Sequence, residues 1–94
     1  MVNTAHKGRR AEHRAQRILE AAGYTTTRAA GSKGAADLIA WNGQTVRFIQ
    51  VKAGQRGCGP LEREALRSMA KPGNATVEVW RFLDRCREPM IEVL

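Results

Sequence analysis

The sequence has few aromatic residues and few cysteines, and each shortage argues against a class of protein. Aromatic residues make up 5% of the 94 positions, which disfavours RNA or single-strand recognition by base stacking. The 2 cysteines, Cys58 and Cys86, lie too far apart for a CxxC metal knuckle, and His6 and His13 do not pair with them at zinc-finger spacing. The sequence therefore predicts free thiols.

Long hydrophobic runs are missing as well. No apolar segment approaches the roughly 20 residues that a membrane-spanning helix needs. The opening segment, MVNTAHKGRRAEHR, is polar and basic and lacks the apolar core of a signal peptide. We therefore expect an intracellular, cytoplasmic protein with no membrane partner. Hydrophobic residues still make up 43% of the chain, enough for one packed domain.

Acidic residues are scarce, since 9 Asp and Glu face 16 Lys and Arg and leave a formal net charge of +7. This balance suits nucleic acid, an anionic membrane surface or an acidic partner. A membrane-surface helix needs a large apolar face with aromatic or leucine anchors, whereas the basic N-terminal segment carries mainly alanines. A membrane surface is therefore disfavoured, nucleic acid and an acidic partner remain, and a merely solvated helix face is the plainer alternative. The basic residues that crowd this segment are Lys7, Arg9, Arg10, Arg14 and Arg17.

Apolar periodicity and turn signals predict an α/β chain of the α+β type, with the element order αβββαββ. Helices are expected over 5–22, stopped by Gly23, and over 60–70, begun by Pro60. Strands are expected over 24–29, 36–41, 45–52, 76–82 and 89–93. The predicted buried side chains are Ala11, Ala15, Ile18, Leu19 and Ala22 on the first helix, and Leu61, Ala65, Ser68 and Met69 on the second.

A hairpin is predicted at Asn42-Gly43, which folds the third strand back along the second. Asp37 opens the second strand and Gln50 lies near the end of the third, so the turn brings these two residues together. Gln50 and Lys52 are two residues apart and share one face of their strand. A carboxylate, an amide oxygen and an ammonium group are therefore predicted to meet in one place.

These groups suit Mg²⁺, which prefers hard oxygen ligands and keeps several of its waters. The predicted ligands are the Asp37 carboxylate, the Gln50 amide oxygen and the Val51 backbone carbonyl. Glu12 lies at the border between the apolar and polar sides of the first helix, where its carboxylate can bind the ion directly or through water. Lys52 would orient the attacking water or stabilise charge on the phosphate during phosphodiester cleavage.

Each of these residues also has a plainer interpretation. An Asp at a strand start is usually a turn or capping residue, and a Lys at a strand end is usually solvated. A Gln within a strand is often structural, and Glu12 alone would suit a helical pairing near Gln16 or Arg9. The combination of a helix-rim carboxylate with a hairpin that carries Asp on one arm and Gln-x-Lys on the other favours a metal-dependent nuclease.

Several segments together resemble the PD-(D/E)XK nuclease superfamily and, within it, the archaeal-type Holliday junction resolvases, a group also found in viruses. These segments are Lys7-Gly8-(x)3-Glu12, Arg28, Gly31-Ser32, Asp37-Leu38-Ile39-Ala40 and Phe48-Ile49-Gln50-Val51-Lys52. The resemblance implies a restriction-endonuclease-like single domain over residues 1–94, with a central mixed sheet flanked by helices. The second helix and the later strands would resemble the side that forms a dimer.

The resemblance also implies an activity. Such enzymes are Mg²⁺-dependent endonucleases, with Mn²⁺ as an expected substitute and no small-molecule cofactor. They act as homodimers on branched DNA, and they resolve four-way (Holliday) junctions by paired symmetric nicks that leave 5′-phosphate ends. The implied contacts to DNA are made by Lys7, Arg9, Arg10, Arg14, Arg28 and Lys33.

The resemblance also implies a role for each residue of the predicted site. Glu12 corresponds to the helix acid that joins the metal site, and Asp37 to the Asp of the PD element. Gln50 stands at the (D/E) position, followed by Lys52 as the motif lysine. Ser32 matches the loop serine that these resolvases place near the scissile phosphate.

The sequence departs from the family pattern at two positions. Ala36 stands where the pattern has Pro, which alters backbone rigidity more than chemistry. Gln50 replaces the usual carboxylate, so the metal loses one negative neighbour, and Glu12 is the candidate for compensation. Two alternatives stay open: a nuclease of this superfamily with another DNA target, and a catalytically inactive DNA-binding module that keeps the basic surface. The charge alone would also suit a ribosome- or RNA-binding protein, which the few aromatic residues disfavour.

Overall fold

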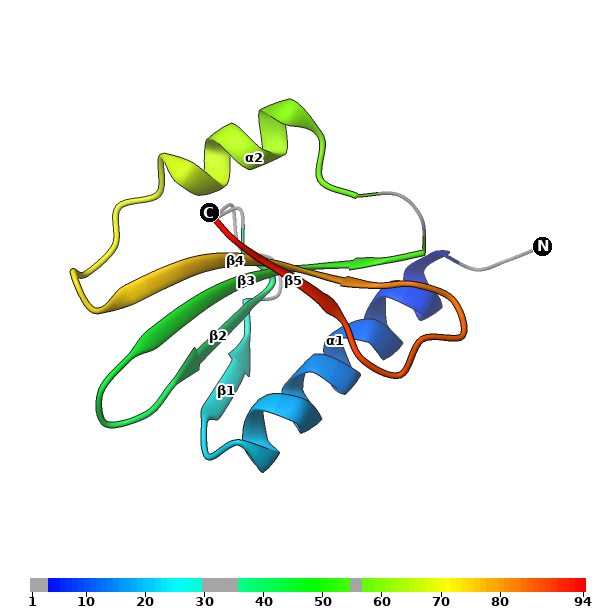
Figure 1. Ribbon diagram of the computed structural model, residues 1–94, viewed down its shortest axis with the longest axis horizontal. Coiled ribbons are helices and arrows are strands. Elements are labelled where there is room, and N and C mark those ends of the chain that lie inside the picture. The colour runs from blue at the N-terminus through cyan, green and yellow to red at the C-terminus, as the bar shows by residue number, and fades with distance from the viewer. Residues whose placement is uncertain (1–3, 30–35, 55–56) are drawn as a thin grey trace.

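The computed structural model describes residues 4–29, 36–54 and 57–94 and shows one mixed sheet with a helix on each face (Figure 1). The elements are α1 Thr4–Ala21, β1 Thr25–Arg28, β2 Leu38–Trp41, β3 Val46–Ala53, α2 Pro60–Arg67, β4 Ala75–Phe82 and β5 Met90–Val93. The predicted α+β class and the order αβββαββ are confirmed. None of the described helices is both long and apolar enough to cross a bilayer, and Cys58 and Cys86 are free thiols as expected.

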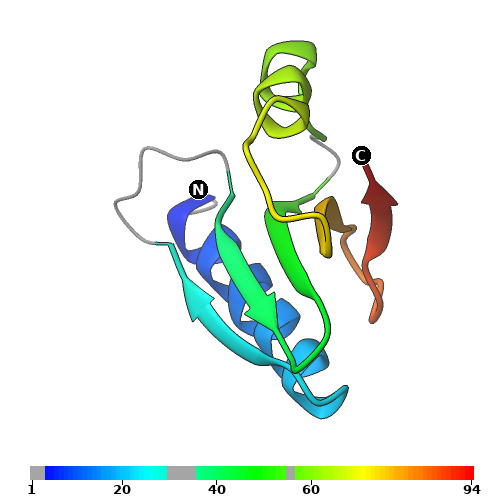
Figure 2. The ribbon, with the colours of Figure 1, turned by 90° about the vertical axis from the view of Figure 1, so that its left-hand side faces the viewer.

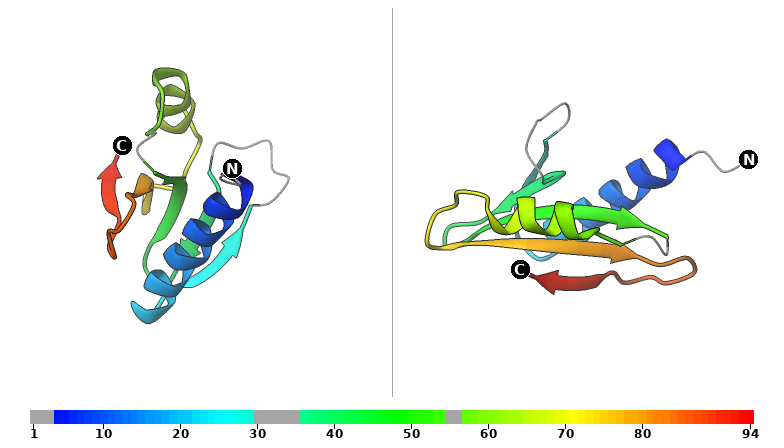
Figure 3. Two further views of the ribbon diagram at one scale, coloured as in Figure 1. Left: turned by 90° about the vertical axis from the view of Figure 1, so that its right-hand side faces the viewer. Right: turned by 90° about the horizontal axis from the view of Figure 1, so that it is seen from above.

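The sheet has the strand order β1-β2-β3-β4-β5, so every strand pairs with its neighbour in sequence. All pairs are antiparallel except β3 with β4, which run parallel. A parallel pair needs a crossover connection, and α2 supplies it. The crossover places α2 on the sheet face opposite α1, as the two side views show (Figures 2 and 3).

The larger core lies between α1 and the sheet. Ala11, Ala15 and Leu19 are buried on α1 against residues of β2, β3 and β4 that include Leu38 and Ile49. Small alanine side chains let the helix axis lie close to the sheet, and the left-handed backbone of Gly23 (φ +94°) ends the helix as predicted.

The predicted stripe on α1 is too wide. Ile18 is 37% exposed, and Ala22 is exposed and lies beyond the last helical residue, Ala21. The helix buries only the narrow row of side chains that points straight at the sheet, so residues on the shoulder of the stripe remain in solvent.

The second core is small and explains why the prediction for α2 was wrong. Only Leu66 is buried on this helix, where it packs with Val77 and Val79. Leu61, expected to be buried, is 88% exposed, because at about 100° per residue it lies about 140° around the helix from Leu66.

Ala65 of α2 and Ser68, which directly follows the helix, are exposed, whereas Met69 is half-buried against Leu66. Ser68 and Met69 both follow the last helical residue, and the Met69 N–H bonds to the Leu66 carbonyl (3.2 Å), which brings Met69 close to Leu66. The helix also ends at Arg67 rather than at residue 70. Since α2 is short and contributes one buried side chain, its apolar residues do not define a continuous face.

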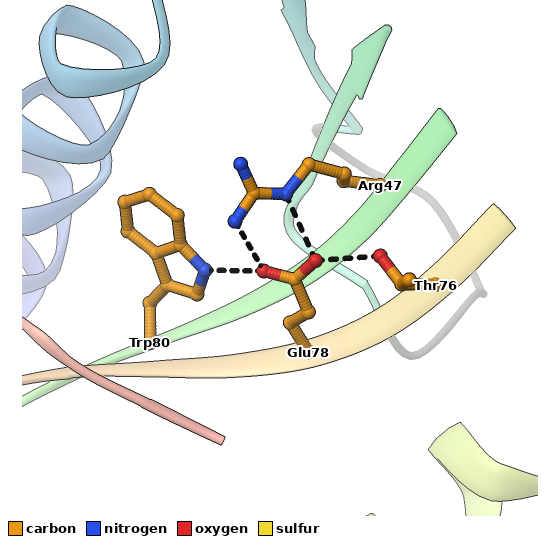
Figure 4. Close-up of polar contacts among 4 residues, drawn as sticks. All are labelled: Arg47, Thr76, Glu78 and Trp80. Carbon is orange, nitrogen blue, oxygen red and sulfur yellow. Dashed lines mark hydrogen bonds and ion pairs between the residues drawn. The ribbon is translucent and has the colours of Figure 1, made fainter. Parts of the chain in front are cut away.

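A polar network is buried within the larger core, where Glu78 on β4 is 2% exposed (Figure 4). Its carboxylate accepts two hydrogen bonds from Arg47 on β3 (2.8 and 2.7 Å), one from Thr76 (2.5 Å) and one from the Trp80 indole (2.8 Å). The Arg47 guanidinium also lies over the rings of Tyr24 and Trp80. The network therefore joins β3 to β4 inside the sheet.

The charge of Glu78 is stabilised by these partners. Burial alone would raise the pKa of this carboxyl group. Hydrogen bonds from Arg47, Thr76 and Trp80 outweigh burial and hold the pKa below its ordinary value of 4.5. The carboxylate therefore contributes stability above about pH 4.5, and that contribution is lost as the pH falls through the lowered pKa.

We expect the substitution Glu78→Gln to lower the free energy of unfolding at pH 7 by about 3 kcal/mol, because it leaves Arg47 without its partner charge. The difference from wild type should narrow as the pH falls below about 4.5, where the wild-type carboxylate takes up a proton. Denaturant titrations at several pH values measure this difference. Glu64→Gln, which changes an exposed carboxylate, is the control, and a Glu78→Gln deficit that is constant with pH would contradict the assignment.

Candidate active site

The hairpin between β2 and β3 brings the two ends of the predicted site together. The side-chain oxygen of Asn42 accepts hydrogen bonds from the backbone N–H groups of Gln44 (2.9 Å) and Thr45 (2.8 Å), which closes the turn. At the far end of the hairpin, the Asp37 N–H donates to the Ile49 carbonyl (2.9 Å). The predicted approach of Asp37 to the end of β3 is confirmed.

Alternation along β3 decides which side chains share a face. Ile49 and Val51 are buried in the core beneath α1, so Gln50 and Lys52 lie on the opposite face, the one that α2 covers. Asp37 directly precedes Leu38, a buried residue of the α1 core, and therefore belongs to the α2 face as well. The predicted shared face of Gln50 and Lys52 is confirmed, with Asp37 on the same side.

Asp37 is fixed by the backbone of the neighbouring strand, since its carboxylate accepts a hydrogen bond from the Val51 N–H (3.0 Å). Burial raises the pKa of the Asp37 carboxyl, and this effect exceeds the opposing hydrogen bond from Val51. The negative charge of Glu12 raises the pKa further, the positive charge of Lys52 lowers it, and Glu62 raises it. The charges of Glu12, Lys52 and Glu62 therefore all influence the Asp37 carboxyl.

Glu12 approaches the site from the other side of the sheet. It lies on α1, and its carboxylate pairs with the Arg28 guanidinium of β1 (2.8 Å) rather than with a helical neighbour. Arg28 stands opposite Leu38 in the β1–β2 register, one residue from Asp37. Glu12 is thus held near the Asp37 end of β2, with its charge matched by Arg28.

Lys52 has a partner that sequence reasoning missed. Its ammonium group donates to the Glu62 carboxylate of α2 (2.6 Å). The other Glu62 oxygen accepts from the Gly59 N–H (3.4 Å) at the start of that helix, and the Lys52 hydrogen bond lowers the pKa of Glu62. The signal in the sequence was a Glu at the third position of a helix that Pro60 begins, which is a capping pattern.

The remaining predicted residues fall into three groups. Arg9 and Arg10 are exposed on α1. Arg14 instead donates to the backbone carbonyls of Cys86 (2.8 Å) and Arg87 (2.7 Å), and its guanidinium lies over the Phe82 ring. Arg14 is therefore engaged within the fold, where it ties α1 to the β4–β5 connection. Ser32, Lys33 and the side chain of Lys7 lie outside the described residues.

Oxygen ligands for a cation are present, although acidic residues are few. Within the described part of the chain, no three Asp, Glu, His or Cys side chains gather in a group able to hold a metal ion, which agrees with the neutral amide at position 50. Asp37 and Gln50 offer side-chain oxygens on one face. The Val51 N–H points toward Asp37, and a strand residue directs its N–H and C=O to the same side, so the Val51 carbonyl lies on this edge too.

Comparison with known proteins places the chain in a family. The family model described as archaeal Holliday junction resolvase (Hjc) matches residues 3–77, a span that includes Glu12, the hairpin and α2. The chain belongs to the archaeal Holliday junction resolvase family. The family match therefore covers every element that carries the candidate site.

A solved structure supports the same assignment. The chain is similar to Hjc of Archaeoglobus fulgidus, described as a Holliday junction resolvase from an archaeal hyperthermophile, with a TM-score of 0.74 and 28% sequence identity. The match covers 94% of this chain and 71% of the other. A search of curated proteins found no match. The resolvase fold of this chain is therefore supported by sequence and by three-dimensional similarity.

Proposed function

We propose that this resolvase-family protein is a Mg²⁺-dependent endonuclease that cuts four-way DNA junctions. The observation that carries the proposal is the shared face of Asp37, Gln50 and Lys52 at one end of the β2–β3 hairpin. The formal net charge of +7 suits a polyanionic substrate. We also infer an intracellular location and a single nuclease domain over residues 1–94, without a small-molecule cofactor.

The ligand set fits a hard cation. We propose that Asp37, the Gln50 amide oxygen and the Val51 carbonyl hold Mg²⁺, with Glu12 as a further carboxylate and with Mn²⁺ as a substitute. The fit rests on the Asp37 carboxylate, which is partly buried. Burial disfavours its negative charge and so raises its pKa. A bound cation would stabilise that charge. When bound, the ion supplies Lewis acidity at the scissile phosphate.

The protein side chains would position the water, stabilise the phosphate and hold the DNA. Lys52 carries a positive charge on the same face as Asp37 and would orient the attacking water or stabilise charge that develops on the phosphate. Ser32 would contact the phosphate next to the cleaved bond. In-line attack by water would leave a 5′-phosphate, and Arg9, Arg10, Lys7, Lys33 and Arg28 would hold the DNA backbone.

One observation favours a second candidate function. Gln50 is neutral, and a site with one carboxylate fewer binds Mg²⁺ less well, as expected of an inactive module that binds branched DNA without cutting it. The retained Asp37, Lys52 and Glu12 favour an active enzyme. Cleavage of another branched DNA, such as a flap, is the enzymatic alternative.

We expect Asp37→Ala to abolish cleavage of a four-way junction, while its affinity for the junction changes less than about threefold. The loss should follow from the missing metal ligand, since Asp37 contributes no part of the basic surface. End-labelled junctions and a linear duplex of the same arms, each incubated with and without Mg²⁺, measure cleavage. Gel shifts in Ca²⁺ measure binding.

In the same assay, wild type should nick opposing strands of the junction and leave the duplex intact. Binding without cleavage by wild type would favour the inactive module, and cuts in flaps alone would favour the other nuclease. Equal loss of binding and cleavage in Asp37→Ala would remove Asp37 from the metal site.

We expect the double variant Arg9→Ala/Arg10→Ala to bind the junction with a weaker salt dependence. Each phosphate contact releases about one counterion, so the slope of log affinity against log salt should fall by about 2 in magnitude. Fluorescence anisotropy at several salt concentrations measures the slope. Lys71→Ala, which removes an exposed cation just before β4, at the end of the sheet away from Lys52, is the matched control. An unchanged slope in the double variant would exclude Arg9 and Arg10 from the DNA interface.

We further propose that the active form is a homodimer, because paired symmetric nicks need two active sites. Apolar side chains are exposed along the edge strand β5, where Met90 is 58% and Val93 62% exposed. A second copy that covers β5 would bury these side chains and the unpaired edge of the strand.

We expect Val93→Lys to convert a dimer into monomers, because it places a charge among the apolar side chains that the second copy would cover. Light scattering after size-exclusion chromatography measures the mass. Ile18→Lys, which changes an exposed apolar residue of α1, is the control. A wild-type monomer at micromolar concentration, or a dimer that Val93→Lys leaves intact, would contradict the proposed interface.

A further inference from the structure

We propose that Glu62 supplies the negative charge that Gln50 lacks and positions Lys52 for catalysis. This inference rests on the proposed nuclease function and names a residue outside the hairpin motif. Glu62 lies on α2, ten residues beyond Lys52, as the sequence shows. Its carboxylate nevertheless reaches the same face of the sheet, where it holds the Lys52 ammonium at 2.6 Å.

The charges of the site support this role. Asp37 and Lys52 cancel, and Gln50 adds nothing, so these three side chains together are neutral. A carboxylate at position 50 would have left the trio with one net negative charge, which favours a divalent cation. Glu12 is already matched by Arg28 (2.8 Å), so the added charge of Glu62 restores the balance that a carboxylate at position 50 would give.

The effect of Glu62 reaches the proposed metal ligand. Glu62 holds the Lys52 ammonium at 2.6 Å. Lys52 directly follows Val51, whose N–H donates to the Asp37 carboxylate at 3.0 Å. A cation bound by Asp37 would therefore be attracted by Glu62 as well. Because Lys52 is held by its hydrogen bond to Glu62, its ammonium group has a fixed position before DNA binds.

Capping of α2 does not by itself account for this geometry. The two oxygens of Glu62 divide their roles: one accepts from the Gly59 N–H at 3.4 Å, a long hydrogen bond, and the other accepts from Lys52 at 2.6 Å. Pro60 at the first helical position already favours the helix start. The shorter contact, between two charges, is the one that faces the site.

The test uses Glu62→Gln, which keeps an oxygen able to accept from Gly59 and removes only the charge. Calorimetric titration of the full-length protein with Mn²⁺, without DNA, should show affinity reduced about tenfold. Mg²⁺ titration of single-turnover junction cleavage should show a matching rise in the half-saturating concentration. Glu64→Gln, on the exposed side of the same helix, should match wild type in both measurements.

A second variant distinguishes a loss of charge at the site from a structural defect in α2. The double variant Gln50→Glu/Glu62→Gln returns one carboxylate to the site and should recover the Mn²⁺ affinity to within about threefold of wild type, whereas Gln50→Glu alone should bind Mn²⁺ more tightly than wild type. A cap or folding defect would show as a lowered melting temperature without rescue, and that result overturns the proposal. Unchanged Mn²⁺ affinity in Glu62→Gln overturns it as well.

The two proposals fail separately. If wild type binds Mn²⁺ but cuts no junction, the proposed function is wrong, while the Mn²⁺ titrations still decide the role of Glu62. If wild type cuts junctions and Glu62→Gln behaves like Glu64→Gln, the nuclease proposal stands and the role of Glu62 is rejected.

Discussion

The fold depends on a charge that is almost completely removed from solvent. Glu78 is 2% exposed, and a buried carboxylate is tolerable only when its oxygens are saturated with donors. Arg47, Thr76 and Trp80 meet that need only if β3 and β4 run parallel in the observed register, in which Arg47 pairs with Thr76. A shift of one residue would point Arg47 to the other face and leave Glu78 unpaired. The network therefore selects one register for β3, the strand that carries the site.

The sequence was most informative where the signal is local. Asn42-Gly43 predicted the hairpin because its turn chemistry is specific, and alternation along β3 predicted that Gln50 and Lys52 share a face. The prediction for α2 was less successful, since helical periodicity cannot show how much sheet surface is available on each side. Leu61 looks like a core residue in the sequence, yet the second core has room for Leu66 alone on this helix.

The same distinction between local and distant contacts applies to the site. Asp37, Gln50 and Lys52 lie on the two arms of one hairpin, so a pattern of strands and a turn was enough to bring them together. Glu12 was expected to lie at the rim of its helix, but its pairing with Arg28 needed the packing of α1 against β1. Glu62 belongs to the crossover helix, and its contact with Lys52 depends on the path of the chain after β3, which periodicity does not describe.

Strand β3 contributes both to the stability of the protein and to its proposed chemistry. One face of the strand packs in the core, and the other carries residues of the proposed site. Ile49 and Val51 are buried beneath α1, and the backbone of Val51 in turn fixes the Asp37 carboxylate. Gln50 and Lys52 alternate with these core residues along the strand. The packing that fixes Ile49 and Val51 therefore also fixes the backbone that carries Gln50 and Lys52. A neutral residue at position 50 changes the charge of the site without changing this framework, so compensation can come from any carboxylate that reaches the same face. The start of α2, the next element after β3, brings Glu62 to the Lys52 side chain and can supply it.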